Sequence, residues 1–522
     1  MIAYLKGGAR VKISLRQFRF VCFLFLILML LSSCRGEVLP LSVTEGPSVL
    51  TPEAPSKTTV GLLNPDAEVR GLWIATVGNI NFPSKQGLSE NELKAELEEI
   101  VSKCTELGLN TIFFQVRPAA DALYDSELFP ASEFVSGKQG QVPSGGIDCL
   151  KYLISIAHAV KINVHAWVNP LRVTYGSAKY PKTELTYLSE GHIARQNPNW
   201  VIPYADGKLY FDAGNPAVRD YIALGVKEIV SGYGVDGVVF DDYFYPYPVS
   251  GAEFDDSASF SSYGTGTLED WRRENINALV KACYDAVKSV STECLFGISP
   301  FGIWQNDDGK NGGSATKGLE AYESLYCDAL AWARGGYVDY LAPQLYWRFD
   351  TKAAPYGYLS DWWNSALDGT GVKLLISHAA YMYDEWESPS GELTAQIEHS
   401  REALSYRGSV LYGYAAIASD SSKICEEITQ LFDREIIYSD PSTNYKELTL
   451  SGIKDGMITA NATVKITGES DPTVLLTFEG KRINRGKNGE FELEIDLSAG
   501  ENKIVFIYGD KEFEFTVTKT EE

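Results

Sequence analysis

Val235-Asp-Gly-Val-Val-Phe-Asp-Asp-Tyr-Phe-Tyr-Pro246 is the stretch that decides the fold, because it places two adjacent carboxylates, Asp241 and Asp242, directly after a strongly apolar run. A short apolar run between turn residues is typical of a strand that is buried on both faces of a parallel sheet. The stretch therefore predicts a buried parallel strand that ends in two carboxylates.

Seven further apolar runs of this kind lie between Arg70 and Asp433, and helical patterns separate them. One of these helices is predicted to begin at Ser89, which stands in capping-box spacing with Glu92, and another at Asn215-Pro216. Eight strand–helix units in succession predict an α/β protein of the (β/α)8 or TIM-barrel type rather than an open sheet. The predicted strands are Gly71–Thr76, Thr111–Arg117, Asn163–Asn169, Gly237–Tyr243, Leu295–Phe301, Tyr340–Tyr346, Lys373–Tyr381 and Ser409–Ile417.

The N-terminal region predicts export and a lipid anchor. Residues 1–33 begin with basic residues, continue with an apolar run from Phe20 to Leu31, and resemble a lipoprotein signal peptide. The ending Leu31-Ser-Ser-Cys34 resembles the bacterial lipobox, so Cys34 is the predicted lipidated residue and the membrane anchor at the cell membrane or outer membrane. An uncleaved anchor, or an ordinary signal peptide with a chance cysteine, is the alternative.

Composition divides the rest of the chain into three predicted parts. Residues 34–69 are rich in Pro, Ser, Thr and Gly and predict a flexible tether. Residues 70–438 hold the barrel pattern. Residues 439–522 contain short, often alternating strands between Gly-, Asn- and Asp-rich turns, and they predict a small Ig-like β-sandwich as an accessory domain.

Charge and cysteine usage narrow the set of partners. The formal net charge of −23 disfavours nucleic acid and anionic lipid headgroups. The six cysteines that follow Cys34 are widely scattered and show no ligand spacing for zinc, so buried thiols are expected, with disulfides as the alternative. No metal or cofactor is predicted, and the oligomeric state is left open.

Polar residues gather at the ends of five predicted strands. Alternate strand residues point into a barrel, and the last of them lie at its functional face. The residues that follow this spacing are Gln115 and Arg117; His165, Trp167 and Asn169; Asp241 and Tyr243; Ser299; and Gln344 and Tyr346. Five strands that converge in this way predict a single site.

Adjacent carboxylates in a partly dry cleft have their pKa values driven apart, so one can stay protonated near neutrality as a general acid. Glycoside cleavage needs such an acid, together with a second carboxylate or a substrate group at the anomeric carbon. Asp241 is the predicted acid, while Asp242 could instead only pair with Arg117 or cap a loop. No second catalytic carboxylate is obvious, and the candidates are Asp121, Glu320, Asp384 and Glu385.

Five motifs carry a family resemblance over roughly residues 65–435: Arg70-Gly-Leu-Trp-Ile-Ala-Thr76, Phe114-Gln-Val-Arg-Pro-Ala-Ala-Asp-Ala-Leu-Tyr124, His165-Ala-Trp-Val-Asn-Pro-Leu-Arg172, the 236–246 part of the opening stretch, and Leu341-Ala-Pro-Gln-Leu-Tyr-Trp347. With them the chain resembles the glycosyl-hydrolase-like family 10. The resemblance implies a TIM barrel that acts on bacterial envelope glycans, with relatives that include a division-site enzyme cutting peptidoglycan strands stripped of their stem peptides. A more distant relative, which cuts partially deacetylated poly-N-acetylglucosamine, also uses paired Asp residues, and that pairing carries over onto Asp241 and Asp242.

The sequence thus predicts an endo-acting glycoside hydrolase of an N-acetylhexosamine-containing envelope glycan, with Asp242 orienting the substrate or tuning Asp241. A non-catalytic glycan-binding lipoprotein on a barrel scaffold and a nutritional polysaccharide hydrolase are the alternatives. The predicted partners are the glycan and, through the Cys34 lipid only, the membrane. Substrate contacts are predicted for Arg117, Asp121, Tyr124, His165, Trp167, Asn169, Tyr243, Ser299, Gln344, Tyr346 and Trp347.

Overall fold

The computed structural model describes residues 67–520, apart from 311, 387–390, 419–422, 434–435, 437–445, 472–473, 484, 486–488 and 510. The predicted signal peptide, Cys34, nearly all of the tether and the domain boundary at 438/439 therefore lie outside the described residues. None of the helices in the described part has the length and apolar character needed to span a bilayer.

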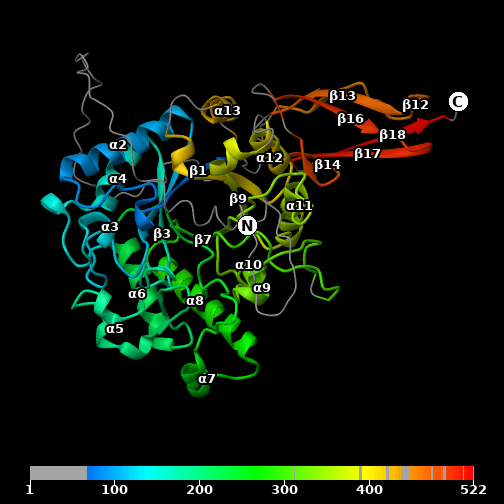
Figure 1. Ribbon diagram of the computed structural model, residues 1–522. Helices are drawn as coiled ribbons and strands as arrows, with labels where there is room; N and C mark the ends of the chain where they lie inside the picture. The colour runs from blue at the N-terminus through cyan, green and yellow to red at the C-terminus, as the bar shows by residue number, and fades with distance from the viewer. Residues whose placement is uncertain are drawn as a thin grey trace, which may run out of the picture. The chain divides into compact units, whose positions relative to one another are not determined.

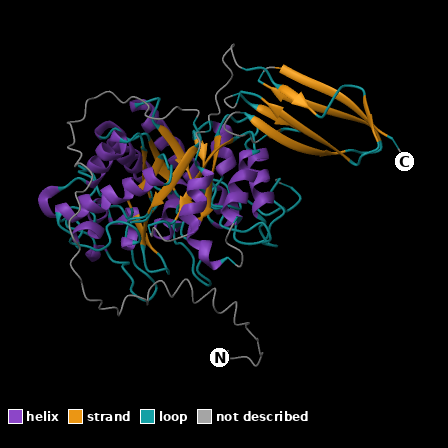
Figure 2. Cartoon of the chain, turned by 90° about the horizontal axis from the view of Figure 1, so that it is seen from above, coloured by secondary structure: helices purple, strands orange, loops and turns teal. Residues whose placement is uncertain are grey.

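Eight parallel strands close into a barrel, which confirms the predicted fold (Figure 1). Around the barrel the strands follow the order β1-β10-β9-β8-β7-β6-β3-β2. Figure 2 shows the strands in the middle of this part of the chain and the helices around them. The strands are β1 (Val69–Ile74), β2 (Thr111–Arg117), β3 (Asn163–Val168), β6 (Gly237–Phe240), β7 (Leu295–Ile298), β8 (Tyr340–Leu341), β9 (Lys373–Ala379) and β10 (Tyr406–Tyr412).

Several strands are shorter than the sequence predicted. β8 has two residues, and Gln344 continues it only through isolated bridges to Phe301 and Ser377. β10 begins three residues earlier than predicted, at Tyr406. Because β6 ends at Phe240, both carboxylates of the opening stretch lie just beyond the strand rather than within it.

A main helix follows each barrel strand, as the alternating pattern predicted. Ser89 and Glu92 form the predicted capping box, and Asn215 caps the helix whose first residue is Pro216. These helices are α2 (Glu90–Glu106), α4 (Cys149–Ala159), α6 (Pro216–Gly232), α8 (Leu268–Val290), α10 (Ala329–Gly335), α11 (Tyr356–Ala366), α12 (Glu392–Arg401) and α13 (Lys423–Leu431).

Short elements fill the strand–helix connections. After β3 they are α5 (Ile193–Gln196) and the hairpin β4 (Val201–Pro203) and β5 (Leu209–Phe211), and after β6 there is α7 (Ser257–Tyr263). α3 (Glu133–Ser136) and α9 (Ala321–Ser324) lie in the connections after β2 and β7. The connections after β3 and β6 lie at the carboxyl ends of their strands, where a TIM barrel carries its site.

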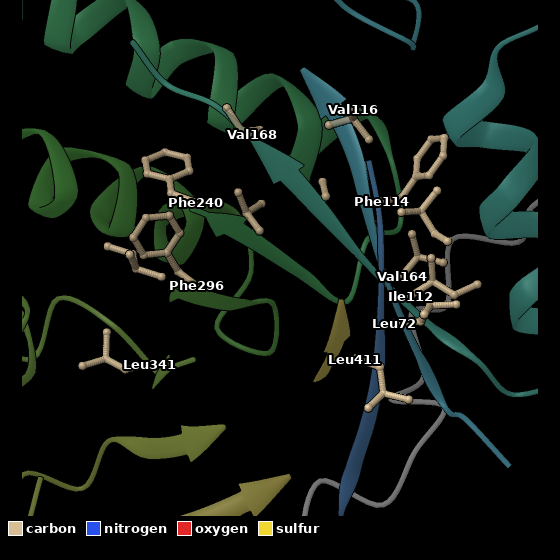
Figure 3. Close-up of a cluster of buried hydrophobic side chains, with 14 of the residues drawn as sticks. Leu72, Ile112, Phe114, Val116, Val164, Val168, Phe240, Phe296, Leu341 and Leu411 are labelled. Atoms are coloured by element: carbon tan, nitrogen blue, oxygen red, sulfur yellow. The ribbon is translucent and has the colours of Figure 1, made fainter. Parts of the chain in front are cut away.

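The barrel strands separate two hydrophobic clusters. Alternate residues such as Leu72, Phe114 and Phe240 belong to the outer cluster, which is shared with the surrounding helices (Figure 3). The residues between them form an inner cluster, which includes Trp73, Phe113, Trp167, Val239 and Tyr340. The inside of the barrel is therefore packed with side chains, and only its end is available for a site. The six described cysteines are all buried free thiols, as expected.

The C-terminal part is a β-sandwich, as predicted. One sheet has the order β11-β13-β16 and the other β12-β18-β17-β14-β15, the arrangement of an Ig-like fold. Both sheets supply side chains to one core, which is separate from the core of the barrel. The strands are β11 (Thr449–Ser451), β12 (Met457–Thr459), β13 (Thr463–Glu469), β14 (Leu476–Phe478), β15 (Lys481–Arg482), β16 (Glu490–Asp496), β17 (Gly500–Tyr508) and β18 (Lys511–Lys519).

Candidate active site

Asp241 and Asp242 lie at the carboxyl end of β6 and are both buried, with 4% and 3% of their surface exposed. The hydrogen bonds of Asp241 come from the neighbouring strand β3 and from its own loop. The amide nitrogen of Asn169 donates to Asp241 Oδ1 at 2.7 Å and to Oδ2 at 2.6 Å, and the indole of Trp167 donates to Oδ2 at 3.1 Å. The backbone N–H of Tyr243 donates to Oδ1 at 3.2 Å.

A chain of amides sets the orientation of Asn169. Its Oδ1 accepts hydrogen bonds from Gln115 Nε2 at 2.5 Å and from the Arg172 guanidinium at 2.7 Å. The Oε1 atom of Gln115 in turn accepts the backbone N–H groups of Thr76 and Val77 at 2.8 and 2.9 Å. Because both acceptor oxygens are occupied, the Asn169 nitrogen must face Asp241.

Asp242 is held by different partners. The amide of Gln344 donates to Asp242 Oδ1 at 2.9 Å and also to the backbone oxygen of Ser299 at 3.2 Å. The hydroxyl of Tyr247 donates to Asp242 Oδ2. The loops after β6, β7 and β8 thus meet at this carboxylate.

Burial raises the pKa of both carboxyl groups. Burial and then the charge of Asp242 raise the pKa of Asp241 to about 7, against the opposing effects of Arg172 and Asn169. Because the two carboxyl groups repel each other, this near-neutral proton belongs to the pair, and the hydrogen-bonding groups around each carboxyl group decide which of the two carries it. Hydrogen bonds from Tyr247 and Gln344 lower the pKa of Asp242 and oppose its burial. The site can therefore hold a proton near neutral pH.

Aromatic rings lie around the pair. Tyr346 stacks on Tyr412 with ring centroids 5.9 Å apart, and Tyr381 packs edge-on against both. Tyr243 lies 5.4 Å from the Tyr247 ring and below the Arg172 guanidinium. Tyr243 and Tyr381 are 39% and 47% exposed, so part of each residue is open to solvent.

A family model described as glycosyl hydrolase-like 10 matches residues 68–388. The chain belongs to this family. It is 40% identical to the glycosyl hydrolase YngK of Bacillus subtilis (strain 168) over 354 residues, 66% of this chain and 68% of that protein. It is 34% identical to the glycosyl hydrolase DigH of Escherichia coli (strain K12) over 405 residues, 74% of this chain and 90% of that protein. The chain is thus an enzyme of the glycoside hydrolase class.

Solved structures resemble the barrel only distantly. They include the PgaB (BpsB) glycoside hydrolase domain from Bordetella bronchiseptica, with 10% identity and a TM-score of 0.46 over 70% of this chain and 99% of that chain. The endo-1,4-beta-mannanase from Rhizomucor miehei has 12% identity and a TM-score of 0.44 over 71% of this chain and 96% of that chain.

Four residues of the site were not singled out in the sequence: Arg172 and Tyr247, which hold the pair, and the ring residues Tyr381 and Tyr412. Arg172 is the last residue of the family motif His165–Arg172, and its position three residues after Asn169 could have indicated that it belongs to the site. Tyr247 lies one residue beyond the opening stretch, and nothing in its spacing distinguishes it from the neighbouring tyrosines. Arg172 and Tyr247 reach the pair through loops, which strand alternation does not describe.

Arg117 was predicted to point into the barrel, and this prediction is wrong. A register irregularity between Gln115 and Arg117 breaks the alternation in β2, so Arg117 pairs with Val168, a member of the outer cluster. Its guanidinium carbon lies 4.2 Å from the centre of the Phe129 ring, on the helix side of the strand. The alternative pairing of Arg117 with Asp242 is therefore also wrong.

Three further predicted contact residues lie away from the pair. Asp121 is buried in the loop after β2, where it accepts the backbone N–H of Glu133 at 3.2 Å. Tyr124 packs edge-on against Tyr233. His165 lies inside the barrel, where its Nδ1 is 2.8 Å from the Tyr340 hydroxyl and burial lowers its pKa to about 4.

The other predicted residues take peripheral positions. Ser299 contributes its backbone oxygen, while its hydroxyl donates to Ala342 O at 2.7 Å. Trp347 is half-buried beside Phe301, 5.8 Å between ring centroids. Among the other candidate acids, Glu320 accepts the Asn306 backbone N–H at 2.5 Å, and Asp384 and Glu385 are exposed. No group of three or more acidic, histidine or cysteine side chains in the described ranges could hold a metal ion.

Proposed function

We propose that the chain is an endo-acting hydrolase of an N-acetylhexosamine-containing envelope glycan, such as peptidoglycan strands. The observation that carries the proposal is the buried Asp241–Asp242 pair at the carboxyl end of β6, held by residues of the loops after β3, β6 and β8. Membership of the glycosyl hydrolase-like 10 family supports hydrolysis of a glycosidic bond. The resemblance described above supports the envelope glycan as the substrate.

The pair has the two properties that glycoside cleavage requires. One carboxyl group with a raised pKa can protonate the leaving glycosidic oxygen. A second, ionised carboxylate next to it stabilises the positive charge that develops at the anomeric carbon. Both groups are buried and held by hydrogen bonds before substrate binds, so little reorganisation is needed during the reaction.

The tyrosines around the pair suit a sugar chain. Pyranose rings present apolar C–H faces that pack against aromatic side chains, and Tyr243 and Tyr381 are exposed aromatic residues of the site. Tyr346 and Tyr412 stack on each other and both contact the Tyr381 ring. We propose that these four residues, with Trp347, contact the sugars on either side of the scissile bond.

Product analysis tests the proposed activity. Purified protein is incubated with intact peptidoglycan, with peptidoglycan stripped of its stem peptides by an amidase, and with α-glucan and plant polysaccharides. We expect soluble N-acetylhexosamine oligosaccharides by mass spectrometry, from the stripped strands above all. Cleavage of only the α-glucan or plant polysaccharide would instead indicate a nutritional hydrolase, and binding without any cleavage would indicate a glycan-binding lipoprotein.

We also propose that the protein is exported and anchored through lipid on Cys34. The lipobox-like ending at Cys34 supports this location, which would place the enzyme beside an envelope glycan. Mass spectrometry of the membrane-extracted protein is expected to show an acylated N-terminal Cys34. A Cys34→Ser variant is expected to lose the acyl group, and a mature form that begins at another residue would contradict the proposal.

A further inference from the structure

The two carboxylates differ in the kind of hydrogen-bonding group that faces them. Every hydrogen bond that reaches Asp241 from the described residues comes from an N–H group: the amide of Asn169, the indole of Trp167 and the backbone of Tyr243. Amide and indole N–H groups donate but cannot accept a hydrogen bond. A proton on Asp241 would therefore face a donor at either oxygen.

Rotation of the Asn169 amide cannot relieve this conflict. Such a flip would turn the Asn169 oxygen toward Asp241, but it would also turn the amide nitrogen toward the donors of Gln115 and Arg172. Gln115 cannot compensate, because its own oxygen accepts two backbone N–H groups. The network thus keeps donors around Asp241 and favours its ionised form.

Asp242 has a partner that suits both of its protonation states. The Tyr247 hydroxyl donates to Asp242 Oδ2 when the carboxylate is ionised. A hydroxyl is also an acceptor, so after rotation it can receive the hydrogen bond of a protonated Asp242. The Tyr247 ring is held by contacts with Tyr243 and Phe301, which keep its oxygen at the carboxyl group.

We propose that Asp242 carries the transferable proton, that Tyr247 is the residue that positions it, and that Asp241 remains ionised. The inference rests on the proposed function, and it reverses the roles that the sequence suggested for the two carboxylates. Asp242 would be the catalytic acid, whereas Tyr247 would act only through Asp242.

The reaction follows from this placement of the proton. The Asp242 carboxyl group gives its proton to the glycosidic oxygen, and the bond from that oxygen to the anomeric carbon breaks with its electron pair left on the departing oxygen. The Asp241 carboxylate stabilises the positive charge at the anomeric carbon. Water then adds to this carbon and gives a proton to Asp242, which restores the acid.

Other ionisable groups face the pair, and the test must take them into account. Arg172 from the loop after β3 lowers the pKa of both carboxyl groups, and the charge of Asp242 acts on the buried thiol of Cys327. Tyr243, Tyr247, Tyr346 and Tyr412 also feel the charge of the pair, and burial raises the pKa of each of them. Burial also raises the pKa of the Cys327 thiol, and the thiol and the tyrosines then titrate well above pH 7, so a near-neutral titration step at this site belongs to the carboxylates.

A titration that needs no substrate tests which carboxyl group holds the proton. The carboxyl carbons of all aspartates are labelled with ¹³C, and their NMR signals are followed as the pH is changed. The titration step of the pair is the near-neutral step that is lost in Asp242→Asn. Tyr247→Phe removes a donor from ionised Asp242, so we expect this step to move to higher pH by about one pH unit. Gln344→Met removes the other donor and is expected to move the step in the same direction.

Trp167→Phe is the matched variant on the other side of the pair, because it removes a donor from Asp241. Asp241 is ionised before and after the near-neutral step in our proposal, so Trp167→Phe should leave that step in place. Tyr245→Phe, two residues from Tyr247 and outside the hydrogen bonds of the pair, controls for the loss of a buried hydroxyl. A step that moves with Trp167→Phe and not with Tyr247→Phe or Gln344→Met would overturn the inference.

A kinetic measurement separates this inference from the proposed function. A good leaving group needs little protonation, so Asp242→Asn should retain most of its rate on a 2,4-dinitrophenyl oligosaccharide of N-acetylglucosamine and lose it on the natural glycan. Asp241→Asn should lose rate on both. If the wild type cleaves neither substrate, the proposed function fails, while the titration still shows which carboxyl group holds the proton. If the dinitrophenyl substrate restores the rate of Asp241→Asn and not that of Asp242→Asn, the inference is overturned.

Discussion

The ends of β6 and β2 have similarly polar sequences, yet their side chains point to different sides of the barrel wall. After β6, Asp241 and Asp242 remain at the end of the barrel and accept hydrogen bonds from residues that follow β3 and β8. At the end of β2, an irregularity in register turns Arg117 to the helix side, where it packs over Phe129. Polar residues at a strand end therefore predict a site only while the alternation of the strand is unbroken.

A raised carboxyl pKa does not by itself distinguish the end of β6 from the loop after β2. Burial raises the pKa of Asp121 to about 7, the same value as that of Asp241. The second cause differs, because Asp121 is repelled by Glu133 and Asp241 by Asp242. Asp121 caps the backbone of its own loop, whereas Asp241 faces side chains from another strand. A shifted pKa becomes evidence for function only with such a surrounding constellation.

The largest expected effect is at the end of β6. Asp242→Asn keeps the size of the side chain but removes the proton that the proposed reaction needs. We expect kcat to fall by about 10²–10⁴-fold while glycan binding survives. The measurement is kcat and KM on stripped peptidoglycan strands. Asp255→Asn, an exposed change of the same charge in the same loop, is the control, and equal losses in both variants would contradict a specific role.

Arg172→Met is expected to have the next largest effect. Its guanidinium donates to Asn169 and to Pro118 O at 2.8 Å, and its charge lowers the pKa of both carboxyl groups. Without that charge both pKa values rise, so the basic limb of the pH–rate profile should move to higher pH. We expect kcat/KM at neutral pH to fall roughly tenfold as Asn169 loses a partner. A basic limb that stays in place would show that Arg172 does not act on the pair.

Much of the fold and part of the site follow from local sequence. Local residue periodicity predicted the eight barrel strands and the sandwich. Asn169, Trp167 and Gln344 could be assigned to the site because a parallel barrel brings the carboxyl ends of all its strands to one face. Arg117 could not be placed, since a break in register depends on how β2 pairs with β3. Strand spacing could not assign Tyr247 or Arg172, because loop conformation brings them back to the carboxylates; only Arg172 had a signal of another kind, its place in a family motif close to Asn169.

At the end of β2 we expect an effect on stability rather than on catalysis. The pKa of Asp121 is about 7 in the folded state and near its ordinary value of 3.8 in the unfolded chain. Between these values the folded state binds the extra proton, so this group makes stability fall as pH rises from about 4 to 7. Asp121→Asn removes this dependence and should stabilise the protein at pH 8 by about 1–3 kcal/mol.

Chemical unfolding at pH 4, 6 and 8 measures this effect. The difference in unfolding free energy between Asp121→Asn and the wild type should grow up to about pH 7 and then level off. Asp125→Asn, an exposed change four residues further along, should show no such growth. A large loss of kcat in Asp121→Asn would instead bring the end of β2 back into the catalytic site.

The smallest expected effect is that of Arg117→Met. It tests the difference between the end of β2 and the carboxylate site directly, because Arg172→Met makes the same substitution at the site. Methionine keeps the length of the buried stem over Phe129 and removes a charge that is costly to desolvate. The lost cation–π contact, worth about 0.5–2 kcal/mol, opposes that gain, so stability should change little. Because Arg117 lies on the helix side of β2, kcat and KM should stay within about twofold of the wild type. A tenfold rise in KM would mean that the guanidinium reaches a bound glycan, and that strand alternation holds through the end of β2 after all.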